Sequence, residues 1–96
     1  HENARIFAEA VAAVDGLFVD LESVQSNIIN VDVGGLGIDA ATFAAHLDEQ
    51  RVRGLPGLGT VVRFVTYRGI AREDIDEAIQ AVRGVVATRP WEMARV

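Results

Sequence analysis

The sequence contains neither cysteine nor lysine, and each absence narrows the chemistry that the chain can perform. Without cysteine there is no disulfide framework, no thiolate metal site and no thiol nucleophile. Without lysine, nine arginines carry all the positive charge against fourteen acidic residues, and the formal net charge is −5. The arginines are scattered among the acids and form no basic stripe, so we expect no nucleic-acid partner.

Long apolar runs are also missing. No stretch approaches the roughly 20 apolar residues that span a bilayer, and no signal-peptide pattern opens the chain. We therefore expect no membrane partner and a cytoplasmic location. The 96 residues, half of them hydrophobic, suit one compact domain. Because the chain opens at His1 inside a helical pattern, without methionine or a capping residue, we expect it to have been cut from something longer.

Apolar spacing predicts helices over residues 2–14, from Asp39 through Gln50, and from Ala71 to Pro90. Strands are predicted at 17–19, 27–33 and 60–67, with an edge segment from Val52, a glycine-rich turn at 54–59 and a tail at 91–96. Helices alternating with a small, mostly hairpin-linked sheet predict an α+β fold. We expect two layers, with a mostly antiparallel sheet covered by helices on one face.

Two features that suggest ligand chemistry have simpler interpretations. Gly34, Gly35 and Gly37 match neither a P-loop nor a dinucleotide fingerprint, so they indicate a turn. His46 has no partner at ligand spacing, and we predict no metal site.

Arg63 does not fit a plain core. Period two places it with Val61, Val65 and Tyr67 on one strand face, and the helices must cover the other face. The neighbouring strand adds Asn30 and Asp32. A face that mixes valines with polar groups suits a surface buried against another domain, with a polar pocket at the seam. The alternative is that Arg63 simply pairs with Asp32 across the sheet.

Several segments, in order, resemble the threonine aldolases of the β-eliminating lyase group. The weaker matches are His1-x-Asn3-Ala4 with Ala8-Glu9-Ala10-Val11, Gln25-Ser26-Asn27-Ile28-Ile29, and Leu36-Gly37-Ile38-Asp39 before Phe43-x-x-x-Leu47. The most specific is Val62-Arg63-Phe64-Val65-Thr66, followed by Arg72-Glu73-Asp74-Ile75-Asp76-x-Ala78. The resemblance covers nearly the whole chain and implies the C-terminal small domain of such an enzyme.

The resemblance implies an enzyme that uses pyridoxal phosphate to cleave L-threonine or allo-threonine to glycine and an aldehyde. It assigns Arg63 to the substrate's α-carboxylate. The cofactor needs a Schiff-base lysine, which this chain lacks, so a missing large domain must hold the cofactor. We therefore assign no catalytic, cofactor-binding or metal residue here, and expect the 96 residues alone to be inactive. The intact enzyme is expected to be a homotetramer.

Two positions depart from the family pattern. Tyr67 stands where the family usually has histidine, which leaves open another amino-acid substrate, including an aromatic one. Ala71 stands where a serine or threonine usually caps the last helix. Two other functions remain open: the small domain of an aminotransferase, or a free-standing ligand-binding module with a ferredoxin-like sheet.

Overall fold

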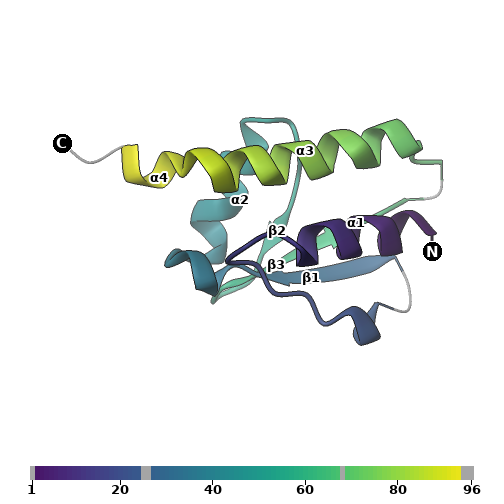
Figure 1. Ribbon diagram of the computed structural model, residues 1–96, viewed down its shortest axis with the longest axis horizontal. Coiled ribbons are helices and arrows are strands. Elements are labelled where there is room, and N and C mark those ends of the chain that lie inside the picture. Colours follow the sequence, from purple (N-terminus) through teal and green to yellow (C-terminus); the bar gives the residue numbers. More distant parts are fainter. Residues whose placement is uncertain (1, 25–26, 68, 94–96) are drawn as a thin grey trace.

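The computed structural model of the protein describes residues 2–24, 27–67 and 69–93 (Figure 1). His1, Gln25 and Ser26 of the resemblance, together with residues 94–96 of the expected tail, lie outside the described residues.

In the described part of the chain, three α-helices follow the expected order, and a short fourth helix comes after them. They are α1 (Glu2–Ala12), α2 (Ala40–Asp48), α3 (Arg72–Thr88) and α4 (Pro90–Met93). α2 begins where expected because the Asp39 carboxylate accepts a hydrogen bond from the Thr42 amide at 2.9 Å. No helix in the described part of the chain is both long enough and apolar enough to cross a membrane.

The sheet has three antiparallel strands, β1 (Ile28–Asp32), β2 (Leu55–Pro56) and β3 (Val61–Val65), in the order β1-β3-β2. The central β3 pairs Ile28 with Val65 and Asp32 with Val61 along β1, and Leu55 with Arg63 along β2. This confirms the predicted α+β class with a small antiparallel sheet.

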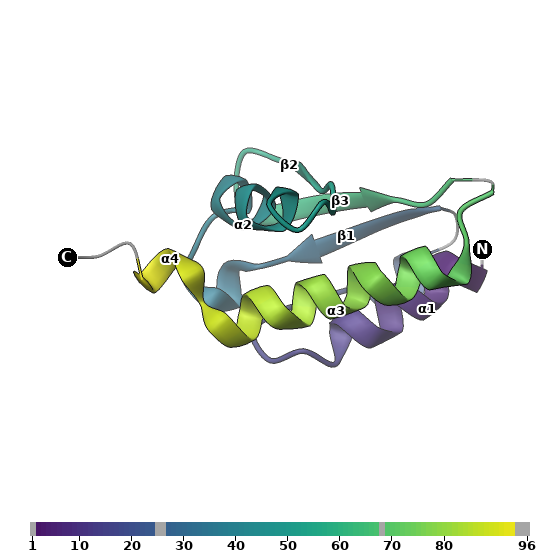
Figure 2. The ribbon, with the colours of Figure 1, turned by 90° about the horizontal axis from the view of Figure 1, so that it is seen from above.

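One face of the sheet packs against the helices. Ile29 and Val31 of β1 and Val62 and Phe64 of β3 are buried, while the residues between them are exposed or half-buried. α1 and α3 lie side by side along β1 and β3, and α2 lies beside β2 (Figures 1 and 2). The rings of Phe7 in α1 and Phe64 in β3 meet at 5.0 Å between centroids. The single core therefore lies between the sheet and the helices.

Three local predictions differ from the structure. Residues 17–19 contribute one bridge, Phe18 to Asp32, and no full strand. β2 lies inside the stretch predicted as a turn, because Leu55 and Pro56 pair with β3. The chain after α3 forms a short helix, α4, where a tail was predicted. Pro90 begins this helix, a position at which no amide proton is needed. Trp91 packs on Phe43, with 6.4 Å between the ring centroids.

Candidate functional site: the open face of the sheet

The open face is the side of the sheet that the helices leave uncovered, made by Ile28, Asn30, Asp32, Leu55, Val61, Arg63 and Val65. Arg63 lies at its centre, with Asn30 of β1 opposite it on one side and Leu55 of β2 on the other. Its two strand neighbours, Val62 and Phe64, are buried against the helices, so alternation directs Arg63 outward. The sequence-based placement of Arg63 with Asn30 and Asp32 is confirmed.

Arg63 is exposed and makes no ion pair with any described residue; the described ion pairs of arginine belong to Arg5, Arg72 and Arg89. The pairing with Asp32 that the sequence left open is therefore not formed. Register explains why: Arg63 faces Asn30 directly, and Asp32 faces Val61 one step further along the ladder.

Asp32 is engaged elsewhere. Its Oδ1 accepts a hydrogen bond from the Gly34 amide at 2.8 Å. The Gly34 amide, and secondly the Thr60 hydroxyl, lower the pKa of Asp32 below its ordinary value because both stabilise the carboxylate. Asp32 thus holds the turn after β1 and leaves Arg63 without a counter-charge.

Apolar side chains surround Arg63. The large hydrophobic side chains that stand exposed among the described residues lie on the open face, at its edges or in the adjoining loops: Phe18, Ile28, Leu55, Leu58, Val61, Val65 and Tyr67. Phe18 reaches the edge through its bridge to Asp32. A soluble monomer seldom gathers its exposed hydrophobics in this way, so the open face has the character of an interface.

A cleft of about 420 Å³ opens where β3 runs on past the short β2. Phe7, Phe64 and Ile75 are buried side chains on its lining, and Arg53 and Tyr67 line it as exposed residues. The sequence analysis placed Tyr67 on the same strand face as Arg63 but did not single out Arg53. The sequence gives little indication of Arg53 as a lining residue, because it comes just before a glycine-rich stretch that indicates a turn.

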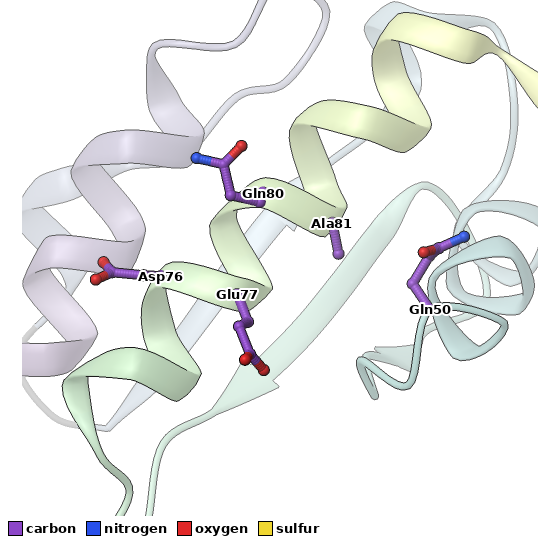
Figure 3. Close-up of a pocket in the computed structure, with 5 residues that line it drawn as sticks. All are labelled: Gln50, Asp76, Glu77, Gln80 and Ala81. Carbon is purple, nitrogen blue, oxygen red and sulfur yellow. The ribbon is translucent and has the colours of Figure 1, made fainter.

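The acidic start of α3 borders this cleft through Asp74 and Glu77 and also lines a second hollow. Gln50, Asp76, Glu77, Gln80 and Ala81 line a shallow hollow between α3 and the end of α2 (Figure 3). Asp76 accepts from Arg72 Nε at 3.1 Å within the same helix.

The residues that the structure describes do not form a site for pyridoxal phosphate or a metal. The chain has no lysine, so it offers no ε-amine for the cofactor. The glycine turn is explained by packing, since a Cβ on Gly35 would lie 2.6 Å from the carbonyl oxygen of Gly16. No group of three histidine, aspartate or glutamate side chains in the described residues is placed to hold a metal ion. His46 packs near Trp91, with ring centroids 6.2 Å apart.

No protein-family model matches the chain, and no curated protein matches it significantly.

Proposed function

We propose that this chain is the small domain of a pyridoxal-phosphate-dependent aldolase that cleaves a β-hydroxy amino acid, and that Arg63 binds the substrate's α-carboxylate. One observation carries the proposal: Arg63 is exposed at the centre of an otherwise largely apolar face and forms no ion pair with a described residue. A guanidinium placed there can bind a carboxylate when another domain covers the face.

The chemistry of Arg63 suits this role. A guanidinium presents two parallel N–H groups that match the two oxygens of a carboxylate. The surrounding apolar side chains would exclude water when covered, which strengthens a charge-assisted hydrogen bond. The β-strand holds the arginine on a rigid element, so it fixes the orientation of the substrate as well as its charge.

The rest of the machinery must come from elsewhere in the enzyme. The cofactor supplies the electron sink for breaking the Cα–Cβ bond. A large domain of the same enzyme would supply the lysine and cover the open face, and we propose a homotetramer located in the cytoplasm. The reaction would release glycine and an aldehyde, whereas an aminotransferase would release a keto acid.

The test uses the full-length enzyme that contains these residues. Arg63→Ala should lower kcat/KM for threonine by roughly 30-fold to several thousand-fold, as expected when one partner of a buried charge pair is removed. Arg63→Lys should recover only part of the loss, because an ammonium cannot reproduce the bidentate geometry. The matched control is Arg83→Ala, which removes an exposed arginine of α3 and should leave kcat/KM unchanged. Unchanged kinetics in Arg63→Ala would refute the assignment.

A further inference from the structure

The cleft beside β3 is lined by charges of both signs, and the two signs come from different elements. Arg51 and Arg53 belong to the segment that follows α2, whereas Asp74 and Glu77 belong to α3. Figure 2 shows α2 and α3 apart across the sheet, and in Figure 3 Glu77 projects from α3 toward the sheet, with Gln50 across from it. A ligand in this cleft therefore meets cations from one element and anions from the other.

The cleft arginines and the cleft acids do not neutralise each other. The ion pairs of the described residues all belong to other arginines or to His46. Asp74 accepts one hydrogen bond, from the Ala71 amide at 3.2 Å. A ligand that carries a cation and an anion can satisfy both groups of side chains at once, because each would gain a charge-assisted hydrogen bond.

The lining between these charges is apolar. Phe7, Phe64 and Ile75 are buried, and Val52 and Ile70 are partly buried. The rings of Phe7 and Phe64 already form an aromatic contact, with centroids 5.0 Å apart. A volume of about 420 Å³ lies within the range of small-molecule sites. The cleft therefore suits one large apolar side chain in addition to the two charges.

Thr66 adds a polar group to the lining. The residue is only 8% exposed, and its amide donates to the Asn27 carbonyl at 2.9 Å. Its hydroxyl forms no hydrogen bond with any described residue. Because buried hydroxyl groups normally have a partner, Thr66 can bond to a polar atom of a ligand.

Arg51 lies in a backbone conformation that favours glycine. Its φ is 64°, and its amide donates to the Asp48 carbonyl at 3.0 Å where α2 ends. Glycine is the usual residue at such a helix end, because a Cβ is strained there. Arg89, the other arginine with positive φ, has an ion pair with Glu92. Arg51 has no ion pair with a described residue, and its position on the lining gives its side chain a role.

We propose that this cleft binds a free α-amino acid with a large apolar side chain. The carboxylate of the ligand lies toward Arg51 and Arg53, and its ammonium group lies toward Asp74 and Glu77. The apolar side chain packs on the buried phenylalanines. This inference goes beyond the proposed function, because Arg63 is not on the lining of the cleft and the binding needs no cofactor.

Calorimetry on the full-length protein tests the proposal, with L-phenylalanine as the probe. L-Phenylalanine should bind, and L-alanine, which keeps both charges but has only a methyl group, should bind roughly 10- to 100-fold more weakly. N-acetyl-L-phenylalanine amide keeps the ring but has neither charge, so it should bind more weakly by roughly 10-fold or more. Equal affinity for this neutral analogue would overturn the proposal and would indicate a groove for a peptide chain.

Variants test each charged group separately. Arg53→Gln should weaken L-phenylalanine by roughly 10-fold and leave phenethylamine, which has no carboxylate, unchanged. Glu77→Gln should weaken L-phenylalanine similarly and leave 3-phenylpropionate, which has no ammonium group, unchanged. Arg51→Gly should weaken L-phenylalanine without lowering the thermal midpoint, because glycine relieves the backbone strain. The matched control is Arg83→Gln, an exposed arginine of α3 outside the cleft lining, which should change nothing.

Arg63→Ala separates this inference from the proposed function. It should leave the affinity for L-phenylalanine unchanged, whereas a loss of binding would place the ligand at Arg63 and overturn the cleft assignment. No binding of L-phenylalanine to the wild type, or an affinity that neither Arg53→Gln nor Glu77→Gln changes, would also overturn it. None of these results depends on cleavage of threonine, so the two proposals can fail independently.

Discussion

Asp32 and Arg63 lie on the same face of the sheet but differ in their interactions. The Asp32 carboxylate accepts from the Gly34 amide and the Thr60 hydroxyl, so it closes the turn after β1. Arg63 has no described counter-charge and is free to bind one from outside the domain. The Asp32 carboxylate is therefore structural, whereas the Arg63 guanidinium is available for the carboxylate that we propose it binds.

Asp32→Asn should remove a pH-dependent part of the stability. Since the pKa of Asp32 is lowered in the folded state, the charged form contributes stability fully above the ordinary carboxyl pKa, about 3.9. That contribution is lost as pH falls through the depressed folded value. Solvent screening keeps the loss in Asp32→Asn at pH 7 below about 1 kcal/mol, and it should shrink as the solution is acidified.

Urea unfolding of wild type and variant between pH 7 and pH 2 measures this difference in the free energy of unfolding. Thr60→Val, which removes only the secondary donor, should show a smaller effect of the same sign. Combining Asp32→Asn with Arg63→Ala should give additive losses, because the two side chains form no ion pair. A strong coupling between them would instead support the cross-strand pair.

At the scale of elements, the two ends of α3 differ in how completely side chains cap them. Its N-terminal residue Ala71 offers no side-chain acceptor, and only half of a capping interaction is present: Asp74 Oδ2 accepts from the Ala71 amide at 3.2 Å. At the other end Arg89 adopts a left-handed conformation with φ 47°. Its Nε donates to Glu92 at 2.8 Å and its guanidinium lies 5.3 Å from the Trp91 ring, which offsets the strain.

Ala71→Ser should stabilise the protein by completing the cap of α3. The serine hydroxyl would accept from an exposed amide of the first turn while Asp74 keeps its bond to the residue 71 amide. We expect a gain of about 0.5–2 kcal/mol. In a domain of this size each kcal/mol raises the thermal midpoint by roughly 4–8 °C, measurable by calorimetry. The control Ala87→Ser, near the other end of α3, should give no gain because serine is a poorer helix former than alanine.

At the scale of the whole molecule, the two faces of the sheet differ in how far their apolar side chains are buried. One face packs into a single core with α1, α2 and α3. The other gathers exposed hydrophobic side chains around Arg63, which forms no ion pair with a described residue. This asymmetry is expected of a domain that covers its open face with another domain or another chain.

The 96-residue chain should accordingly bind a hydrophobic dye or self-associate through the open face. Val61 and Val65, 40% and 36% exposed, lie on either side of Arg63, and replacing both with threonine keeps their β-branched shape. Val61→Thr combined with Val65→Thr should lower dye fluorescence several-fold. If the wild type self-associates, the double variant should sediment mainly as the monomer. Ala45→Ser combined with Ala87→Ser, on exposed helix positions, is the control. A strictly monomeric, dye-negative wild type would favour a free-standing module.

Some features of the protein follow from the sequence alone because they are local. Alternation within one strand was sufficient to separate Arg63 from the helix-facing residues, and the Asp39 cap and the stripe of α3 follow from spacing within a few residues. The absence of lysine needs no structure at all, and it places the cofactor outside this chain in any pyridoxal enzyme. The function itself, by contrast, stays a proposal carried by the resemblance and by the position of Arg63.

Tertiary structure decided the features that depend on pairing between distant segments. Register places Asn30, and not Asp32, opposite Arg63, and no local pattern encodes a register between strands some thirty residues apart. Leu55 joins the open face only because it and Pro56 pair with β3, although their glycine-rich surroundings favour a turn. Which charges remain unpaired is therefore determined by the fold, because it depends on which strands become neighbours.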